Sequence, residues 1–157
     1  MKKLLLTALI LFTFFLGAAQ HAKHSDRVKV DDLIKPHFER FVSLMEEHNI
    51  PVDYDCFDSI EVIPLMDGVQ GIWLKQSRTI LLNYYFYLPV GVTYDEKLDL
   101  IFITLAHEIG HALGWKHIDK EAIGLMNPSN KFDLGIIRGS IGAEQYILNT
   151  YKYHLCN

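Results

Sequence analysis

Three histidines and one glutamate stand close together in residues 107–117. This segment reads His-Glu-Ile-Gly-His-Ala-Leu-Gly-Trp-Lys-His, so His107 and His111 are four positions apart and Glu108 directly follows the first histidine. On an α-helix, side chains four positions apart lie on one face, about 6 Å apart along the axis, so both imidazoles can reach one metal ion. Glu108 then lies beside that ion with its carboxylate free to bind water. The pattern predicts a metal site with an adjacent base.

A third ligand, His117, requires the chain to leave the helix. On a continued helix, His117 would lie about 9 Å beyond His111 along the axis and would point away from the metal. Gly114 lies between the two, and glycine readily adopts the left-handed conformation that ends helices. We therefore expect a turn at Gly114 that brings His117 back to the ion. Three neutral histidines suit zinc and leave its fourth position open to water, which is typical of a catalytic site.

Residues 104–128 resemble the metzincin metallopeptidases, and among them the matrixin-like domains. The resemblance rests on the H-E-x-x-H-x-x-G-x-x-H pattern and on Gly124-Leu125-Met126-Asn127-Pro128, where Met126 lies nine residues after His117 and matches the methionine turn of the family. It implies a zinc metalloendopeptidase with one catalytic zinc ion. The implied ligands are His107, His111 and His117, and the implied structural supports of the site are Gly114 and Met126. Asn127 and Pro128 stand where family members carry tyrosines, so no tyrosine is assigned as a transition-state stabiliser.

The resemblance also implies a mechanism and a way to bind substrate. Peptide bonds would be hydrolysed by a zinc-bound water, with Glu108 as general base that passes the proton to the leaving amine. A protein or peptide substrate would lie extended along the edge strand of the sheet, within residues 69–75. The pocket for the residue after the cut would be formed near His111 and by the segment from Met126 to about Arg138.

Two other functions stay open at the level of sequence. One is a catalytically inactive zinc-containing domain that binds a protein partner, and the other is a hydrolase of short cell-wall peptides. The intact Glu108 weighs against the first, because a pure binding site has little need of a carboxylate beside an open metal position.

The remaining histidines are expected to be solvated or hydrogen-bonded side chains: His21, His24, His37, His48 and His154.

Three helices are expected, one of which carries the site. Apolar residues recur at helical spacing between positions 30 and 48, with a start between Asp31 and Pro36 and a stop at residues 49–51. The most apolar stretch after position 20 is Leu98–Leu113, which we expect to be a helix buried on most sides and preceded by a capping box. The members of that box are Thr93 and Glu96. A final helix is expected from about Ser140, as N-cap, to Tyr153, with Ile147 and Tyr151 on one face.

A small sheet is expected between the first two helices. Residues 59–64 are rich in β-branched side chains and predict a strand, followed by a turn at 66–68. Residues 69–75 and 78–83 predict a hairpin. The aromatic residues 84–87 either extend the sheet or cover the core. The predicted fold class is α+β, a metzincin-like (zincin) domain. It has a small twisted mixed sheet, an N-terminal helix, a zinc-binding active-site helix, and a mostly irregular C-terminal part with a terminal helix.

The beginning of the chain has the layout of a secretory signal peptide. Lys2 and Lys3 precede an apolar run, and small residues follow at 17–19, so we expect residues 1–19 to be a signal peptide and 20–157 to be a single catalytic domain. An uncleaved membrane anchor is the alternative, but the run is shorter than the ~20 residues that span a bilayer. The protein would then be secreted or periplasmic, with no stable membrane span.

Composition and charge limit the classes of partner that the protein can bind. Half of the 157 residues are hydrophobic, which is typical of a compact globular domain. Removal of residues 1–19 takes away two lysines and no acids, so the formal charge moves from −4 to −6 and a nucleic-acid partner is disfavoured. A monomer is expected. The two cysteines, Cys56 and Cys156, are a candidate disulfide in an oxidising compartment, and two buried or free thiols are the alternative.

Overall fold

The computed structural model describes residues 24–87, 92–118, 124–127 and 142–156, apart from the side chains of Phe86, Tyr87 and Cys156. Within these residues the chain forms one sheet of four strands, β1 (Lys29–Val30), β2 (Ser59–Ile63), β3 (Gly71–Leu74) and β4 (Thr79–Asn83), and three helices, α2 (Lys35–Glu47), α3 (Tyr94–Ala112) and α5 (Ala143–Cys156). Two short 3-10 turns cover Tyr54–Cys56 and Tyr84–Tyr87. The protein is therefore an α+β protein with a small mixed sheet, as predicted.

The sheet has the order β1-β2-β4-β3. Strand β2 runs parallel to β1 and to β4, while β3 pairs antiparallel with β4 through the predicted hairpin. Arg78 has a φ of 53°, which lets the chain reverse between β3 and β4. Strand β3 therefore lies at one edge of the described sheet, and its outer side is free of a neighbouring strand.

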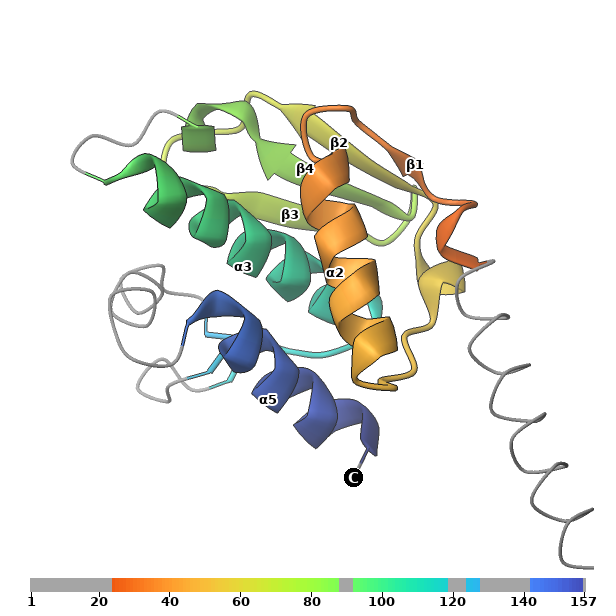
Figure 1. The fold of residues 1–157 in the computed structure, drawn as a ribbon. Helices are drawn as coiled ribbons and strands as arrows, with labels where there is room; N and C mark the ends of the chain where they lie inside the picture. Colours follow the sequence, from red (N-terminus) through yellow and green to blue (C-terminus); the bar gives the residue numbers. More distant parts are fainter. Residues whose placement is uncertain (1–23, 88–91, 119–123, 128–141, 157) are drawn as a thin grey trace, which may run out of the picture.

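The elements form layers, which Figure 1 shows. Helices α2 and α3 lie on one side of the sheet, and α3 contacts β3 and β4. Helix α5 packs against α3 and α2 on the side away from the sheet. Helix α3 is thus enclosed by the sheet and by two helices, and this explains why its sequence is apolar around most of its circumference.

Local chemistry sets the helix ends. Helix α3 begins with the predicted capping box, in which the Thr93 hydroxyl accepts from the Glu96 N–H at 3.2 Å and the Glu96 carboxylate accepts from the Thr93 N–H at 2.8 Å. Helix α2 has Pro36 in its first turn, where the missing N–H costs no hydrogen bond. It ends before Asn49, whose φ of 53° reverses the chain, so the predicted start and stop are confirmed.

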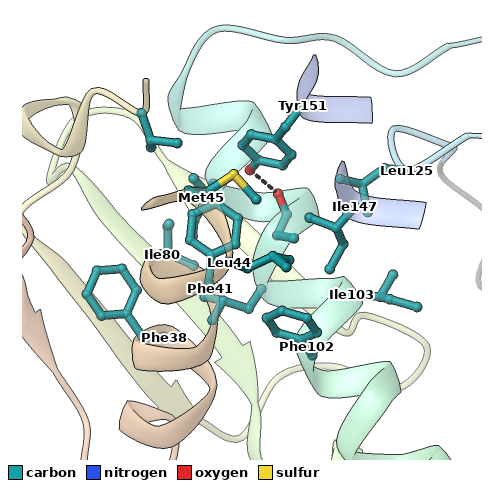
Figure 2. Packing of buried hydrophobic residues seen from close by; sticks show 14 of the residues in the cluster. Phe38, Phe41, Leu44, Met45, Ile80, Phe102, Ile103, Leu125, Ile147 and Tyr151 are labelled. Atoms are coloured by element: carbon teal, nitrogen blue, oxygen red, sulfur yellow. Dashed lines mark hydrogen bonds between the residues drawn. The ribbon is translucent and has the colours of Figure 1, made fainter. Parts of the chain in front are cut away.

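The core joins all three helices to the sheet. Figure 2 shows side chains from α2, α3, α5 and β4 in contact: Phe38, Phe41, Leu44, Met45, Phe102, Ile103, Ile147, Tyr151 and Ile80. The ring of Phe41 packs edge-on against Tyr151 at 5.2 Å, and both side chains are fully buried. Ile147 is also fully buried, so the predicted apolar face of the last helix is confirmed.

Some elements differ from the sequence prediction. Residues 84–87 form a 3-10 turn and so do not extend the sheet. Tyr84 and Tyr85 are 47% and 56% exposed, so these two side chains do not cover the core, while the side chains of Phe86 and Tyr87 lie outside the described ones. Strand β1 was not predicted. Helix α5 runs from Ala143 to Cys156, while its expected N-cap, Ser140, lies outside the described residues.

The expected signal segment, residues 1–19, also lies outside the described residues. Within the part of the chain that the structure describes, no helix combines the length and the hydrophobicity needed to cross a bilayer.

Candidate metal centre and its cleft

Helix α3 carries the first two histidines on its last two turns. The Nδ1 of His107 lies 2.5 Å from the carbonyl of Leu125, and the Nδ1 of His111 lies 2.9 Å from the carbonyl of Trp115. A carbonyl can only accept, so both Nδ1 atoms carry the proton. Each ring is therefore fixed in orientation and presents an unprotonated Nε2, the form that binds metals.

The third histidine reaches the other two through the predicted turn. Gly114 has a φ of +92°, and its N–H donates to the carbonyl of His111 at 3.0 Å. The chain then reverses, and the Nε2 of His117 lies 3.2 Å from the Nε2 of His107 and 3.0 Å from that of His111. The structure thus brings together the three histidines that the sequence singled out.

These distances fit one bound metal ion. Four tetrahedral ligands at zinc–nitrogen bonds of about 2.0–2.1 Å are about 3.3 Å from one another. Because the Nε2 atoms of His107 and His111 are unprotonated, the single Nε2 proton available on His117 can satisfy one of the two short contacts but not both. A cation among the three lone pairs accounts for both. His107, His111 and His117 could therefore hold a metal ion.

The electrostatic surroundings favour the neutral, ligating form of the histidines. The pKa of His107 is lowered to about 4, mainly by burial and also by the nearby His111 and His117, although its hydrogen bond to Leu125 opposes this shift. Burial also lowers the pKa of His117, with a smaller contribution from His111. At neutral pH these two rings are free of the proton that would compete with a metal.

Glu108 lies in the same cleft, on the wall formed by α3. Its side chain is 5% exposed, and burial raises the pKa of its carboxyl to about 7. The backbone N–H of Trp73 donates to this carboxylate and partly offsets the rise. The carboxylate is thus held against the edge strand rather than turned to bulk solvent.

Gly71 makes room for Glu108, a role that sequence reasoning did not identify. A Cβ at this position would lie 2.7 Å from both Cγ and Oε1 of Glu108 and 3.0 Å from its Cδ. No side chain can therefore share this space with Glu108 as it stands. Glycine is unusual within a short strand, which was the one available signal, but its partner 37 positions later could not be inferred.

Met126 lies in a turn beside the helix that carries His107 and His111. The N–H of Asn127 donates to Gly124 at 2.9 Å, and the N–H of Ile118 donates to the carbonyl of Met126 at 3.1 Å. Met126 is 1% exposed, and its Sδ lies 2.8 Å from where a Cβ on Gly110 would be. The turn is thus attached to the residue after His117 and packs on the helix between the two helical ligands.

The three candidate ligands and Glu108 open into one cleft between β3 and α3. It has a volume of ≈ 580 Å³ and is lined by Gly68, Val69, Gln70, Gly71, Ile72, Trp73, Lys75, Thr104, His107, Glu108, His111, Gly114, Trp115, His117 and Asn127. The Thr104 hydroxyl of α3 donates to Gln70 Oε1 at 3.3 Å, which links α3 to the residue before β3. The expected edge strand and the expected metal site therefore face the same space.

Other predicted residues lie apart from this cleft. Cys56 has a free thiol that donates to Asp53 at 3.3 Å, and since the side chain of Cys156 lies outside the described residues, the disulfide stays a prediction. The expected pocket segment from Pro128 to Arg138 is also outside them. Of the other histidines, His24 hydrogen-bonds Asp55 at 2.9 Å and His154 stacks on Trp115.

Comparisons of the chain with protein-family models, with curated proteins and with solved structures gave no match. The functional interpretation therefore rests on the residues and their geometry.

Proposed function

We propose that this protein is a secreted or periplasmic zinc-dependent endopeptidase with a metzincin-like, matrixin-like fold. One observation carries the proposal: three histidine Nε2 atoms converge at the spacing of zinc ligands in a cleft that also contains a buried glutamate. A closed structural site would have a fourth protein ligand. Among the described residues, the metal-binding group has three members, which leaves a position for water.

Several features of the fold support this proposal. A helix that bears two ligands, a glycine turn that returns the third, and a buried methionine turn are what the family resemblance implies. The antiparallel edge strand β3 beside the cleft agrees with it as well. These agreements involve separate segments of the chain.

The chemistry divides between the metal and Glu108. When bound, zinc would supply a Lewis acid that polarises the substrate carbonyl and makes water more acidic. Glu108 would accept the proton of the attacking water and deliver it to the leaving amine, as a general base and then a general acid. His107 and His111 keep their rings oriented through their Nδ1–H bonds to backbone carbonyls.

The substrate would lie extended along β3. The N–H of Asn83 donates to the carbonyl of Gln70, so backbone groups of alternate residues on β3 face β4. Those of Gly71 and Trp73 consequently face away from β4, toward the cleft. A peptide strand can pair there by adding backbone hydrogen bonds to the edge of the sheet.

The test is cleavage of unfolded casein by the purified protein, with and without a zinc chelator, beside Glu108→Gln. We expect zinc-dependent cleavage that falls by about 10²–10⁴-fold in the variant, the usual contribution of a general base, while zinc remains bound. The amide keeps the size of the carboxylate but cannot take the proton, so it isolates this role.

Retained cleavage in Glu108→Gln would contradict the role of Glu108. Zinc binding without cleavage of either casein or a peptide library would instead favour a zinc-containing domain that binds a partner. Cleavage confined to short cell-wall peptides would keep hydrolysis and change the substrate class.

A further inference from the structure

We propose that helix α5 supports the metal affinity of this site by holding Trp115 in place. In this inference Trp115 is a positioning residue for the ligands His111 and His117. Tyr151 and His154 of α5 in turn hold the Trp115 ring. The inference rests on the proposed zinc site, and no part of it follows from the metal-binding pattern itself.

The backbone of Trp115 fixes the position of a ligand. Its carbonyl accepts the Nδ1–H of His111 at 2.9 Å, and its N–H donates to the carbonyl of Gly110 at 3.0 Å. Trp115 also lies two residues before His117, on the same turn. A displacement of Trp115 would therefore change the orientation of His111 and the path to His117 together.

The ring of Trp115 is placed by close packing against α3. A Cβ on Gly110 would lie 2.7 Å from Cε3 and 3.3 Å from Cζ3 of the indole. The ring consequently lies directly against the helix backbone between the two helical ligands. This contact needs glycine on the helix and side chains on the other face of the ring that hold it in place.

Helix α5 packs two aromatic rings against Trp115. The His154 ring stacks on Trp115 with centroids 4.3 Å apart and an interplanar angle of 24°, and the Tyr151 ring lies 4.7 Å away at 59°. Tyr151 is fully buried, and its hydroxyl donates to the carbonyl of Ala106 at 2.7 Å, as the dashed line in Figure 2 shows. Ala106 directly precedes the first ligand, so α5 holds the metal-binding segment at both ends.

A substitution of His154 can distinguish this role from general core packing. Its side chain is exposed and lies outside the buried core cluster, so its removal should cost the fold little. What it contributes is a flat ring on the indole. A group that orients a ligand directly is worth about 10–100-fold in metal affinity, and His154 acts one step further away.

The experiment measures the zinc affinity of the purified protein by competition with a chromophoric chelator at pH 7.5. We expect His154→Ala to weaken zinc binding by about 3–10-fold, less than the 10–100-fold of a group bonded to the ligand itself. His154→Phe should restore most of the affinity because it keeps a flat ring. Lys152→Ala, an exposed change on the same helix, should leave the affinity unchanged. The melting temperature of the metal-free variants checks that the fold is intact.

An unchanged zinc affinity in His154→Ala would overturn the inference, and so would an equal loss in His154→Phe. Because the readout is zinc affinity rather than hydrolysis, failure of the proposed activity is visible separately. A parent protein that binds zinc but cleaves no peptide contradicts the peptidase while the His154 series still decides this inference.

Discussion

The backbone of Gly71 lies directly against the side chain of Glu108, so close that a Cβ would stand 2.7 Å from Cγ. The edge strand and the buried carboxylate thus share one small space, and the N–H of Trp73 on the same strand donates to that carboxylate. The position of Glu108 is set by the strand as much as by its own helix.

Gly71→Ala should reduce hydrolysis and leave zinc binding intact. The new methyl group meets the flexible end of Glu108, which can swing aside at little cost to the fold, but the carboxylate then loses its position. We expect kcat/KM to fall by at least about tenfold, against the 10²–10⁴-fold of a complete general base. Steady-state peptide cleavage and zinc titration measure the two effects.

Leu74→Ala is the matched control for Gly71→Ala, because Leu74 lies on the same strand with an exposed side chain outside the cleft lining. It should keep parental activity. Full activity in Gly71→Ala would show that Glu108 does not need its observed position.

Gly114→Ala should weaken zinc binding through the backbone alone. A Cβ there meets no atom within 4 Å, but the φ of +92° costs a residue other than glycine about 1–2 kcal/mol. Gly114→Asn should lose less, because asparagine tolerates this conformation better. Chelator competition and urea unfolding of the metal-free protein separate affinity from stability.

Gly68 offers the control for Gly114. It too has a positive φ, +83°, and open space around a Cβ, but it lies outside the ligand turn. Gly68→Ala should lose stability with unchanged zinc affinity. Equal affinity losses at both positions would rule out a specific role for the turn at Gly114.

Removal of two buried tyrosine hydroxyls should have different effects on the free energy of unfolding. The hydroxyl of Tyr151 donates to Ala106, so Tyr151→Phe should lower the free energy of unfolding by about 1 kcal/mol. The hydroxyl of Tyr54 is buried and has no hydrogen-bond partner among the described residues, so Tyr54→Phe should be neutral or stabilising. Urea unfolding of the two variants is the measurement, and a larger loss in Tyr54→Phe would contradict this assignment.

His37 should make the metal-free protein less stable in mild acid. Burial lowers its pKa, nearby Arg40 lowers it further, and Asp99 opposes them in part. The unfolded chain, with a histidine pKa near about 6.5, then binds more protons than the folded one, so stability is lost as pH falls through that value. His37→Gln should show a smaller loss between pH 7.5 and 5.5 in urea unfolding. An identical pH dependence in variant and parent would exclude His37 as a cause.

The sequence predicted the elements that are defined by local patterns. Helix α2 and the α3 capping box follow from spacing and from end-capping residues, and the hairpin of β3 and β4 follows from strand propensity around a short turn. The three candidate ligands could be predicted because a helix and one glycine place them within eleven positions of each other. Features that depend on neighbouring residues can therefore be predicted from the sequence.

Long-range placement could not be predicted in the same way. Strand β1 has two residues, too few to show alternation, and it exists because β2 pairs with it. The space shared by Gly71 and Glu108, and the stacking of His154 on Trp115, depend on how separate elements dock. Residues 84–87 carry aromatic side chains typical of strands, yet they form a 3-10 turn.

The stacking of α5 on Trp115 also joins the candidate site to the end of the described chain. A chain emerging from its N-terminus has all three histidines in place once His117 has appeared, but the rings of Tyr151 and His154 follow 34 and 37 positions later. Until then nothing from α5 presses on Trp115. Among the described elements, α5 is the last along the chain, so its contacts with Trp115 are the last of this candidate site to become available during synthesis.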